Sequence, residues 1–394
     1  MNSALTTPLI VGLFVLMALR PPIPRRSSPF NLQFALGYLI NEQPFIGLWW
    51  LLAGTLATLL QPAFLSSLWW LIVVLTVIDA AMLAVLALRA RSARPVLSGA
   101  LRAAFGVEMK PRVTRPSWWR VVLVPVLSWR PDVRRVRNVR YGSAGRANKL
   151  DVYVSRRGAR TGAPVLVYLH GGAFRMGSKS LGAHPLLYRF AAEGWVCISA
   201  DYRQFRARYR DQLHDAHAIL EWTRAHAETY GGDPGKVLVA GGSSGAHLAA
   251  TAALSGAVVR GVIALYGYFG SAGSSPGESW SPHDHVHAQA PPFLIVHGSQ
   301  DTLVLAEDAS AFADRLRAVS RQPVAYAELP GAQHNFDLFH SLRFHSVIDA
   351  VADFAALTVG PGAAGDPTTQ ERTPVSRHHS LDRASDEGTA AEQS

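Results

Sequence analysis

The stretch Val237-Leu238-Val239-Ala240-Gly241-Gly242-Ser243-Ser244-Gly245-Ala246-His247 decides the fold of this chain. A short apolar run rich in valine leads into a cluster of glycines, and residues 246–254, which suit a helix, follow it. Within the cluster, Gly241-x-Ser243-x-Gly245 has the spacing of a sharp strand-to-helix turn that exposes a nucleophilic serine. Glycine two residues before and two residues after the serine leaves room for the backbone to pass close by. The pattern predicts a reactive Ser243, against the alternative of a glycine-rich turn with an incidental serine.

A second glycine-rich stretch, His170-Gly171-Gly172-Ala173-Phe174, comes directly after another predicted strand. Two consecutive glycines allow backbone N–H groups to converge on the turn, and each such donor to an oxyanion is typically worth about 2.7–4 kcal/mol of barrier. We predict that Gly171, Gly172 and Ser244 are these donors. His170 is expected to hold the loop by hydrogen bonds and not to act as a base.

An acidic residue follows the seventh predicted strand, in His297-Gly298-Ser299-Gln300-Asp301. Because functional side chains gather outside the carboxyl ends of parallel strands, we predict that Asp301 is the acid of the site. Asp284 is the alternative.

A histidine follows the eighth predicted strand, in Gly331-Ala332-Gln333-His334-Asn335-Phe336, and we predict that His334 is the general base. His340 and His345 lie in the predicted helix that follows and are poorer candidates. The chain order Ser243, Asp301, His334 matches a known order of nucleophile, acid and base.

From residue 136 onward, short β-rich runs alternate with helical stretches. This alternation predicts a mainly parallel eight-stranded sheet with helices on both faces. The predicted strands are 136–141, 150–154, 165–170, 196–200, 237–240, 259–266, 293–297 and 324–329. The predicted helices are 180–193, 211–230, 244–254, 306–319 and 341–357.

Residues 136–358 resemble the α/β-hydrolase fold, and in particular the carboxylesterases related to hormone-sensitive lipase. The marks of that family are present as His170–Gly172, Asp201-Tyr202-Arg203, Gly231-Gly232-Asp233-Pro234 and the late acid and histidine. Two details depart from it: alanine follows the two glycines, and the elbow reads Gly-Ser-Ser-Gly-Ala. The chain is also similar to isoprenylcysteine methylesterases and to membrane-anchored actinobacterial lipases and esterases.

The resemblance implies a serine carboxylesterase or lipase that hydrolyses small-molecule or lipid esters through an acyl-enzyme, with no cofactor. An amide or formamide hydrolase with the same residues is one alternative. A non-catalytic, ligand-binding pseudo-hydrolase is another, which the intact set of residues disfavours.

The composition points to a membrane. Hydrophobic residues make up 49% of the 394-residue chain, and the formal net charge of +10 is uneven, with 21 lysines and arginines but five acidic residues between positions 20 and 160. A pI near 10.0 first suggests nucleic acid. Here the basic residues flank apolar segments, so we expect a membrane surface and no nucleic acid as the partner.

Three apolar runs, at residues 1–19, 45–60 and 63–88, predict about three transmembrane helices, although the second run is short against the roughly 20 residues that spanning takes. The alternatives are buried core helices and, for residues 1–19, a cleaved signal peptide. Arginines follow the first apolar run at positions 20, 25 and 26 and the third at positions 89, 91 and 94, whereas the connection 61–67 has none. This distribution predicts a multi-pass protein with an outside N-terminus and a cytoplasmic catalytic domain.

The remaining segments complete the predicted domain plan: a membrane region (1–90), an interfacial linker (91–135), the catalytic domain (136–358) and a disordered tail (359–394). Residues 93–107 are expected to form a surface helix. The tryptophan-rich stretch 117–129 suits either the membrane interface or packing on the catalytic domain.

Two further features suggest a site less strongly. The run His283-Asp284-His285-Val286-His287 could suggest a metal, but no second cluster has obvious ligand spacing, so we predict a structural or rim loop and no metal. Cys197 is the single cysteine, which excludes an intramolecular disulfide.

Overall fold

The structure is a computed structural model that describes residues 5–24, 26, 31–60, 69–108, 110–158, 161–272 and 280–360. Three features of the sequence analysis lie outside the described residues: Arg25, the connection 61–67, which contains no lysine or arginine, and the predicted tail from residue 361 onward.

An eight-stranded sheet forms the centre of the catalytic domain, in the order β1-β2-β4-β3-β5-β6-β7-β8. The pairs β1–β2 and β2–β4 are antiparallel and the other neighbouring strands are parallel, so the predicted mainly parallel sheet is confirmed. The strands are β1 Val133–Arg140, β2 Lys149–Ser155, β3 Ala163–Leu169, β4 Val196–Ala200, β5 Gly232–Gly242, β6 Gly261–Leu265, β7 Phe293–Gly298 and β8 Val324–Leu329.

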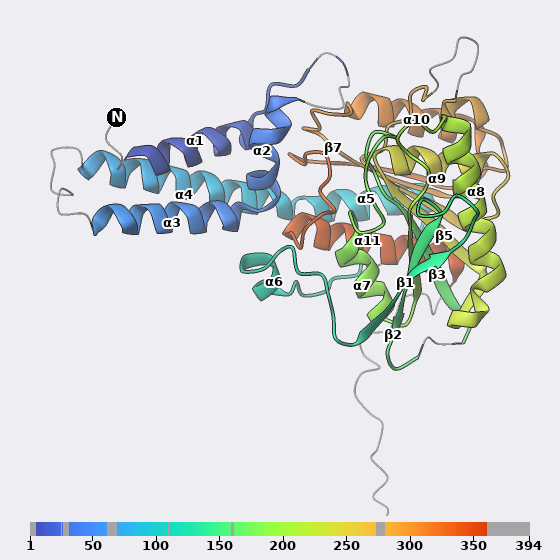
Figure 1. Cartoon of the computed structure of the whole chain (residues 1–394). Helices are drawn as coiled ribbons and strands as arrows, with labels where there is room; N and C mark the ends of the chain where they lie inside the picture. Colours follow the sequence, from blue (N-terminus) through green and yellow to red (C-terminus); the bar gives the residue numbers. More distant parts are fainter. Residues whose placement is uncertain are drawn as a thin grey trace, which may run out of the picture. The chain divides into compact units, whose positions relative to one another are not determined.

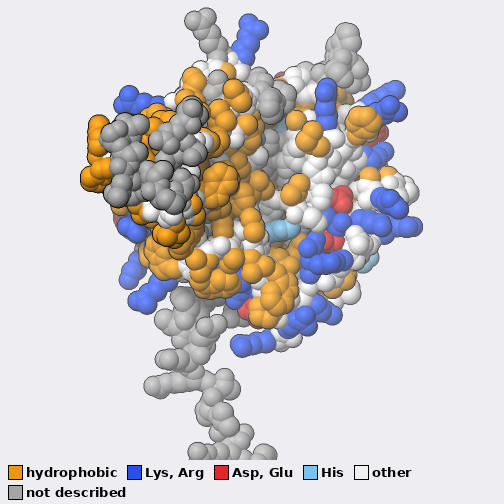
Figure 2. Space-filling model, turned by 60° about the vertical axis from the view of Figure 1, so that its left-hand side comes forward, with side chains coloured by type: hydrophobic (Ala, Val, Ile, Leu, Met, Phe, Trp, Pro, Cys, Tyr) orange, Lys and Arg blue, Asp and Glu red, His pale blue; other side chains and the backbone are white. Residues whose placement is uncertain are grey.

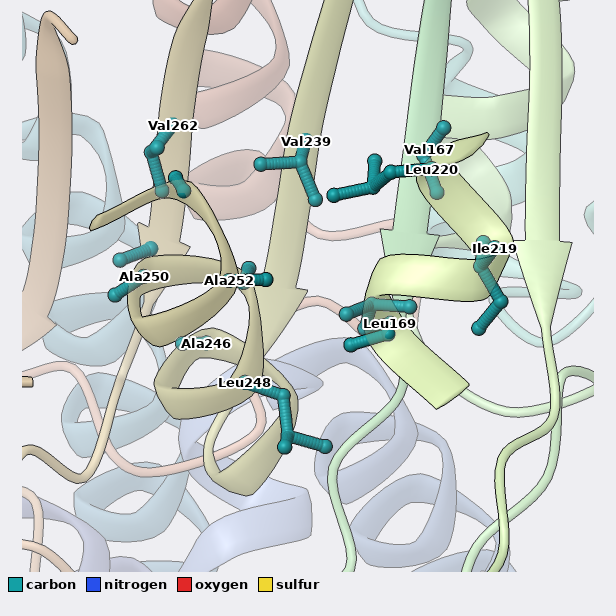
Figure 3. Packing of buried hydrophobic residues seen from close by; sticks show 14 of the residues in the cluster. Val167, Leu169, Ile219, Leu220, Val239, Ala246, Leu248, Ala250, Ala252 and Val262 are labelled. Carbon is teal, nitrogen blue, oxygen red and sulfur yellow. The ribbon is translucent and has the colours of Figure 1, made fainter. Parts of the chain in front are cut away.

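Helices cover both faces of this sheet (Figure 1). Successive strand residues point to opposite faces, so Val167 and Leu169 join one hydrophobic cluster while Leu166 and Tyr168 join the other. The first cluster packs under α8 (Tyr209–His226), α9 (Ser244–Leu254) and α10 (Ala306–Val319), and Figure 3 shows Val239 and Val262 against α8 and α9. The second packs under α7 (His184–Ala192) and α11 (Leu342–Val359).

Helix α5 (Ala93–Phe105) belongs to this second layer. Ala93, Leu97 and Leu101 recur every four residues on one helix face and are buried against α11 and β8. The predicted interfacial linker therefore begins with a helix that contributes to the core of the catalytic domain. Further along, helix α6 covers only Trp118–Val122, because Pro125 interrupts the tryptophan-rich stretch.

The apolar runs before the catalytic domain form α1 (Thr6–Leu19), α3 (Pro44–Leu59) and α4 (Trp69–Arg91), which pack side by side (Figure 1). Among the described residues, one continuous helical stretch, Trp69–Phe105, is long and apolar enough to cross a membrane, whereas α1 and α3 are shorter. At 1.5 Å per residue, α1 and α3 reach about 21 and 24 Å, short of a hydrocarbon core of about 30 Å. The expectation of three spans is therefore not supported by the helix lengths.

The sequence analysis did not predict α2 (Leu32–Glu42). The residue that could have indicated the start of this helix is Asn31. Its side chain accepts a hydrogen bond of 2.8 Å from Phe34 N and so caps the helix. This helix lies between the apolar helices and the catalytic domain, and its contacts are described below.

Candidate functional site

The turn between β5 and α9 places Ser243 in a strained conformation, with φ 54° and ψ −121°. Glycine is required on both sides of it. A Cβ on Gly241 would lie 2.3 Å from Gly245 O, and a Cβ on Gly245 would lie 2.1 Å from Leu169 O. The spacing seen in the sequence is therefore a steric requirement of this turn.

The structure brings Ser243, His334 and Asp301 together. His334 Nε2 lies 2.9 Å from Ser243 Oγ, and His334 Nδ1 lies 2.6 Å from Asp301 Oδ2. The carboxylate that contacts His334 is thus that of Asp301 and not that of Asp284. The other two candidate histidines have other partners: His340 Nε2 lies 3.4 Å from Arg120 Nη1, and His345 Nε2 lies 3.0 Å from Thr114 Oγ1.

Asp301 is held by several donors. Its Oδ1 accepts hydrogen bonds of 2.9 Å from the backbone N–H groups of Leu303 and Val304. Its Oδ2 also lies 3.2 Å from Nε2 of a second histidine, His297, which is fully buried. Burial alone would raise the pKa of Asp301, but the charges and hydrogen bonds of His334 and His297 outweigh burial and lower it. Asp301 therefore stays ionised and can hold His334 in one tautomer.

Two of the three predicted oxyanion donors lie in the loop after β3, and the third, Ser244, directly follows the nucleophile. A Cβ on Gly171 would lie 3.0 Å from both Gly242 O and Ser243 Cβ, so this loop packs closely against the turn that carries the nucleophile. Gly172 has φ 137°, which favours glycine. Ser244 is the first residue of α9, where the N–H groups of a helix have no partner within the helix. Within the described part of the chain, the N–H groups of these three residues donate no hydrogen bond.

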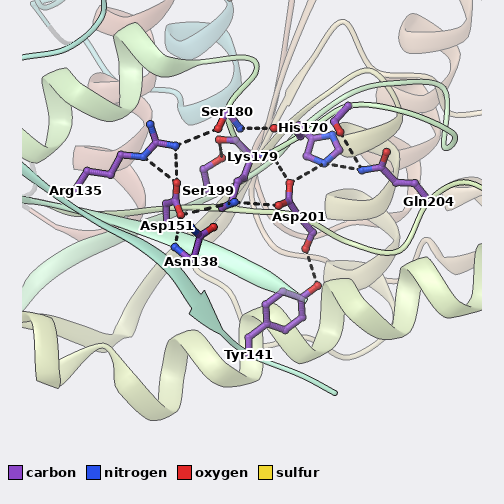
Figure 4. Close-up of polar contacts among 12 residues, drawn as sticks. Arg135, Asn138, Tyr141, Asp151, His170, Lys179, Ser180, Ser199, Asp201 and Gln204 are labelled. Atoms are coloured by element: carbon purple, nitrogen blue, oxygen red, sulfur yellow. Dashed lines mark hydrogen bonds and ion pairs between the residues drawn. The ribbon is translucent and has the colours of Figure 1, made fainter. Parts of the chain in front are cut away.

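His170 anchors the Gly171–Gly172 loop, as expected from the sequence. Its Nδ1 lies 2.8 Å from Gly171 O, its Nε2 lies 3.0 Å from Gln204 Nε2, and its ring stacks on Tyr202. Burial lowers the pKa of His170, so the ring is neutral near pH 7. A network of charged side chains lies next to His170 (Figure 4). Asp201 Oδ2 accepts a hydrogen bond from Lys179 Nζ at 3.1 Å. Lys179 also lies near Asp151, which forms an ion pair with Arg135 on β1.

Sequence reasoning missed a buried polar cluster behind His334. The hydroxyls of Tyr168 and Tyr266 donate to the two oxygens of Asp337, at 2.6 and 2.5 Å. The Tyr266 ring packs edge-on against His334, with centroids 4.7 Å apart. Burial raises the pKa of Asp337, although both hydroxyls oppose this. The strand pattern predicted both tyrosines to be in strands, and the structure has Tyr168 in β3 and Tyr266 directly after β6. Nothing local showed that they share a carboxylate.

Helix α2 also reaches the site. Its Phe34 ring lies 6.4 Å from that of His334, and Tyr38 Oη donates to Asn335 O at 3.0 Å. The histidine-rich run at 283–287 begins with a short 3-10 helix, Pro282–His285. Within the described ranges, no group of three or more metal-ligating side chains comes together.

Two family models match the catalytic part of the chain: BD-FAE over residues 150–271 and the prolyl oligopeptidase family over residues 269–357. Thermogutta terrifontis esterase 2 superposes with a TM-score of 0.52 at 22% sequence identity, covering 60% of this chain and 97% of the esterase. The chain has the α/β-hydrolase fold. In this α/β-hydrolase the serine, acid and histidine follow β5, β7 and β8 in that order.

Curated relatives of this α/β-hydrolase are named as esterases. The probable carboxylic ester hydrolase LipM of Mycobacterium tuberculosis is 35% identical over 58% of this chain and 62% of its own length. Isoprenylcysteine alpha-carbonyl methylesterase ICME of Arabidopsis thaliana is 30% identical over 52% of this chain and 57% of its own. The chain thus spans about three fifths of the length of these relatives.

Proposed function

We propose that the protein is a membrane-anchored serine carboxylesterase or lipase. The observation that carries the proposal is the hydrogen-bonded series Ser243 Oγ–His334–Asp301, at 2.9 and 2.6 Å. The N–H groups of Gly171, Gly172 and Ser244, which donate no hydrogen bond among the described residues, support it. The esterase names of the relatives agree with this reaction class.

In the proposed mechanism, His334 removes the proton of Ser243 as Oγ attacks the ester carbonyl. The negative charge that forms on the carbonyl oxygen is received by the N–H groups of Gly171, Gly172 and Ser244, which donate no hydrogen bond within the described part of the chain and so are free to donate to it. His334 then protonates the leaving alcohol, and water activated by the same histidine hydrolyses the acyl-enzyme. Asp301, ionised throughout, stabilises the imidazolium.

The decisive experiment compares the full chain with its Ser243→Ala variant. We expect the variant to lose hydrolysis of p-nitrophenyl esters of graded acyl length and to lose labelling by a fluorophosphonate probe, while it stays folded. Ser255→Ala, at the other end of α9, is the matched control and should keep both. Labelling that persists at another serine in Ser243→Ala would refute the assignment.

The proposed membrane anchoring is supported by the exposed side chains of the apolar helices. Large apolar residues face outward along α1, α3 and α4, including Leu13, Leu56 and Val77, and Figure 2 shows hydrophobic side chains gathered on this side of the molecule. Exposed apolar area of this extent is unfavourable in water and favourable in lipid. The tryptophan-rich stretch contacts the catalytic domain, where His340 N donates to Pro125 O at 2.9 Å. The exposed side chains of Trp118, Trp119 and Trp129 support a position at the membrane interface.

We propose a cytoplasmic catalytic domain from the arginines that follow the apolar helices, as the positive-inside rule predicts. The test is a pair of C-terminal reporter fusions, one active only in the cytoplasm and one active only after export. Activity of the exported reporter alone would reverse the proposed orientation.

A further inference from the structure

The ends of two apolar helices meet next to the acid of the site. Arg89 Nη1, near the end of α4, donates to Leu19 O at the end of α1 and to Gln300 Oε1, both at 3.2 Å. Gln300 Nε2 also donates to Leu19 O at 3.0 Å. Gln300 directly precedes Asp301. The point where α1 and α4 end is therefore one residue away from the Ser–His–Asp series.

Helix α2 joins the same helices to both loops that carry the acid and the base. The Asn31 side chain pairs with the backbone and hydroxyl of Thr302, next to Asp301. Asn41 Nδ2 donates to Gly331 O at 2.9 Å, and Tyr38 bonds the residue that follows His334. Ser243, in contrast, is bonded to the sheet, because its N–H donates to Leu265 O at 3.0 Å.

The remaining face of α2 is apolar and uncovered. Leu32 is 63% exposed and Leu39 is 37% exposed, and the exposed Ala35 lies between them. Steps of three and four residues put the three side chains on one helix face. This apolar stripe runs along a helix whose other side contacts the His334 loop.

We propose that the site takes an amphiphilic ester held in the bilayer, which reaches Ser243 along the exposed Leu32–Leu39 stripe of α2 while its alkyl chain stays in the lipid. The proposal rests on the esterase function and membrane anchoring proposed above. Arginines at the ends of apolar helices lie at the level of the lipid headgroups. Because Arg89 contacts Gln300, the site lies at that level, which is also where an amphiphile carries its polar ester group. Lipid contact also explains why two leucines are exposed on α2, the helix whose other side contacts the His334 loop.

The test uses the full chain reconstituted into phosphatidylcholine–phosphatidylglycerol vesicles, with two esters of one leaving group. The oleate of 4-methylumbelliferone partitions into the vesicles, and its butyrate is the soluble comparison. The variant is Leu32→Gln/Leu39→Gln. The control is Val258→Gln, which alters a side chain that is 62% exposed before the amino-terminal end of β6, whereas the site lies at the carboxyl ends of the strands. Fluorophosphonate labelling reports that each variant keeps its site.

We expect the double variant to lower kcat/KM for the vesicle-borne oleate about tenfold, because two apolar contacts with the chain are lost, and to leave the butyrate unchanged. Val258→Gln should change neither value. Equal losses on both esters, no loss on either, or the same loss in Val258→Gln would overturn the inference. Hydrolysis of butyrate but not oleate by the unaltered chain would overturn it and leave the esterase function standing. If neither ester is cleaved, the proposed function fails with it.

Discussion

A buried ion pair between Glu42 and Arg343 joins α2 to α11, and we predict that breaking it makes the stability of the protein depend on pH. Glu42 ends α2 and Arg343 lies in α11; both side chains are buried, and Arg343 Nη1 donates to Glu42 Oε1. Arg343 Nε and Nη2 have no partner among the described residues. Burial raises the pKa of Glu42, and the opposing effect of Arg343 does not cancel it.

Replacing Arg343 by Met should therefore destabilise the protein by an amount that grows with pH. The variant leaves Glu42 buried without a counter-charge, which typically costs about 3–5 kcal/mol. In the variant, the pKa of Glu42 in the folded protein rises further above its value in the unfolded chain. The variant therefore keeps its full stability below the unfolded pKa of Glu42 and loses stability as the pH rises toward the folded pKa. Over that window the loss is about 1.36 kcal/mol per pH unit, or about 2.7 kcal/mol between pH 5 and pH 7.

These energies translate into measurable shifts in Tm. An unfolding entropy of about 2.1 cal/mol/K per residue gives about 0.7 kcal/mol/K for the roughly 330 residues that the structure describes. The drop in Tm of Arg343→Met should thus reach about 4–7 °C at pH 7 and be about 3–4 °C smaller at pH 5, by differential scanning fluorimetry in detergent.

Two further variants test the reasoning. Glu42→Gln/Arg343→Met should lose the pH dependence, because no ionisable group remains in the pair. Asp132→Asn breaks the half-exposed pair with Arg130 and should shift Tm by less than about 1 °C. A Tm difference between Arg343→Met and the unaltered chain that does not vary with pH would refute the reasoning, as would a double variant that keeps the dependence.

Three substitutions test the site itself. His334→Ala should lower kcat for a soluble ester by roughly 10⁴-fold because the general base is lost, whereas His340→Ala should remain near normal; the reverse result would move the base. Asp301→Asn should cost about 10⁴-fold through the wrong histidine tautomer, and a mild effect there with a large one in Asp284→Asn would move the acid. Gly171→Ala adds a methyl group 3.0 Å from the Cβ of the nucleophilic serine, so the loop must shift; we expect kcat to fall about 10²–10³-fold with KM little changed, and a normal kcat would remove this residue from the oxyanion hole.

Local sequence was sufficient where local sterics decide the structure. The bounds of β4, β8, α9 and α10 agree with the predicted ranges, because each is a short apolar or amphipathic run with glycine, proline or a polar turn at its ends. The turn at Ser243 was readable because glycine is the residue that fits at Gly241 and Gly245. The roles of nucleophile, acid and base could be predicted because each of the three residues comes directly after a predicted strand.

Sequence patterns were insufficient where the deciding neighbour lies far along the chain. The lengths of α1 and α3, and the absence of α2 from the prediction, show that hydrophobic runs indicate helices without giving their limits or their roles. Asn41 and Gly331 are separated by 290 positions and Tyr168 and Asp337 by 169, so no periodicity connects them.

The sequence by itself determined the turn, the order of the strands along the chain and the residues able to act as nucleophile, acid and base, because each depends on groups a few positions apart. The tertiary structure decided that Asp301 is shared by His297 and His334, that α5 joins the core, and that α2 holds the loops of the site. These contacts form only when the packed layers bring distant polar groups into one low-dielectric interior, where each must find a partner.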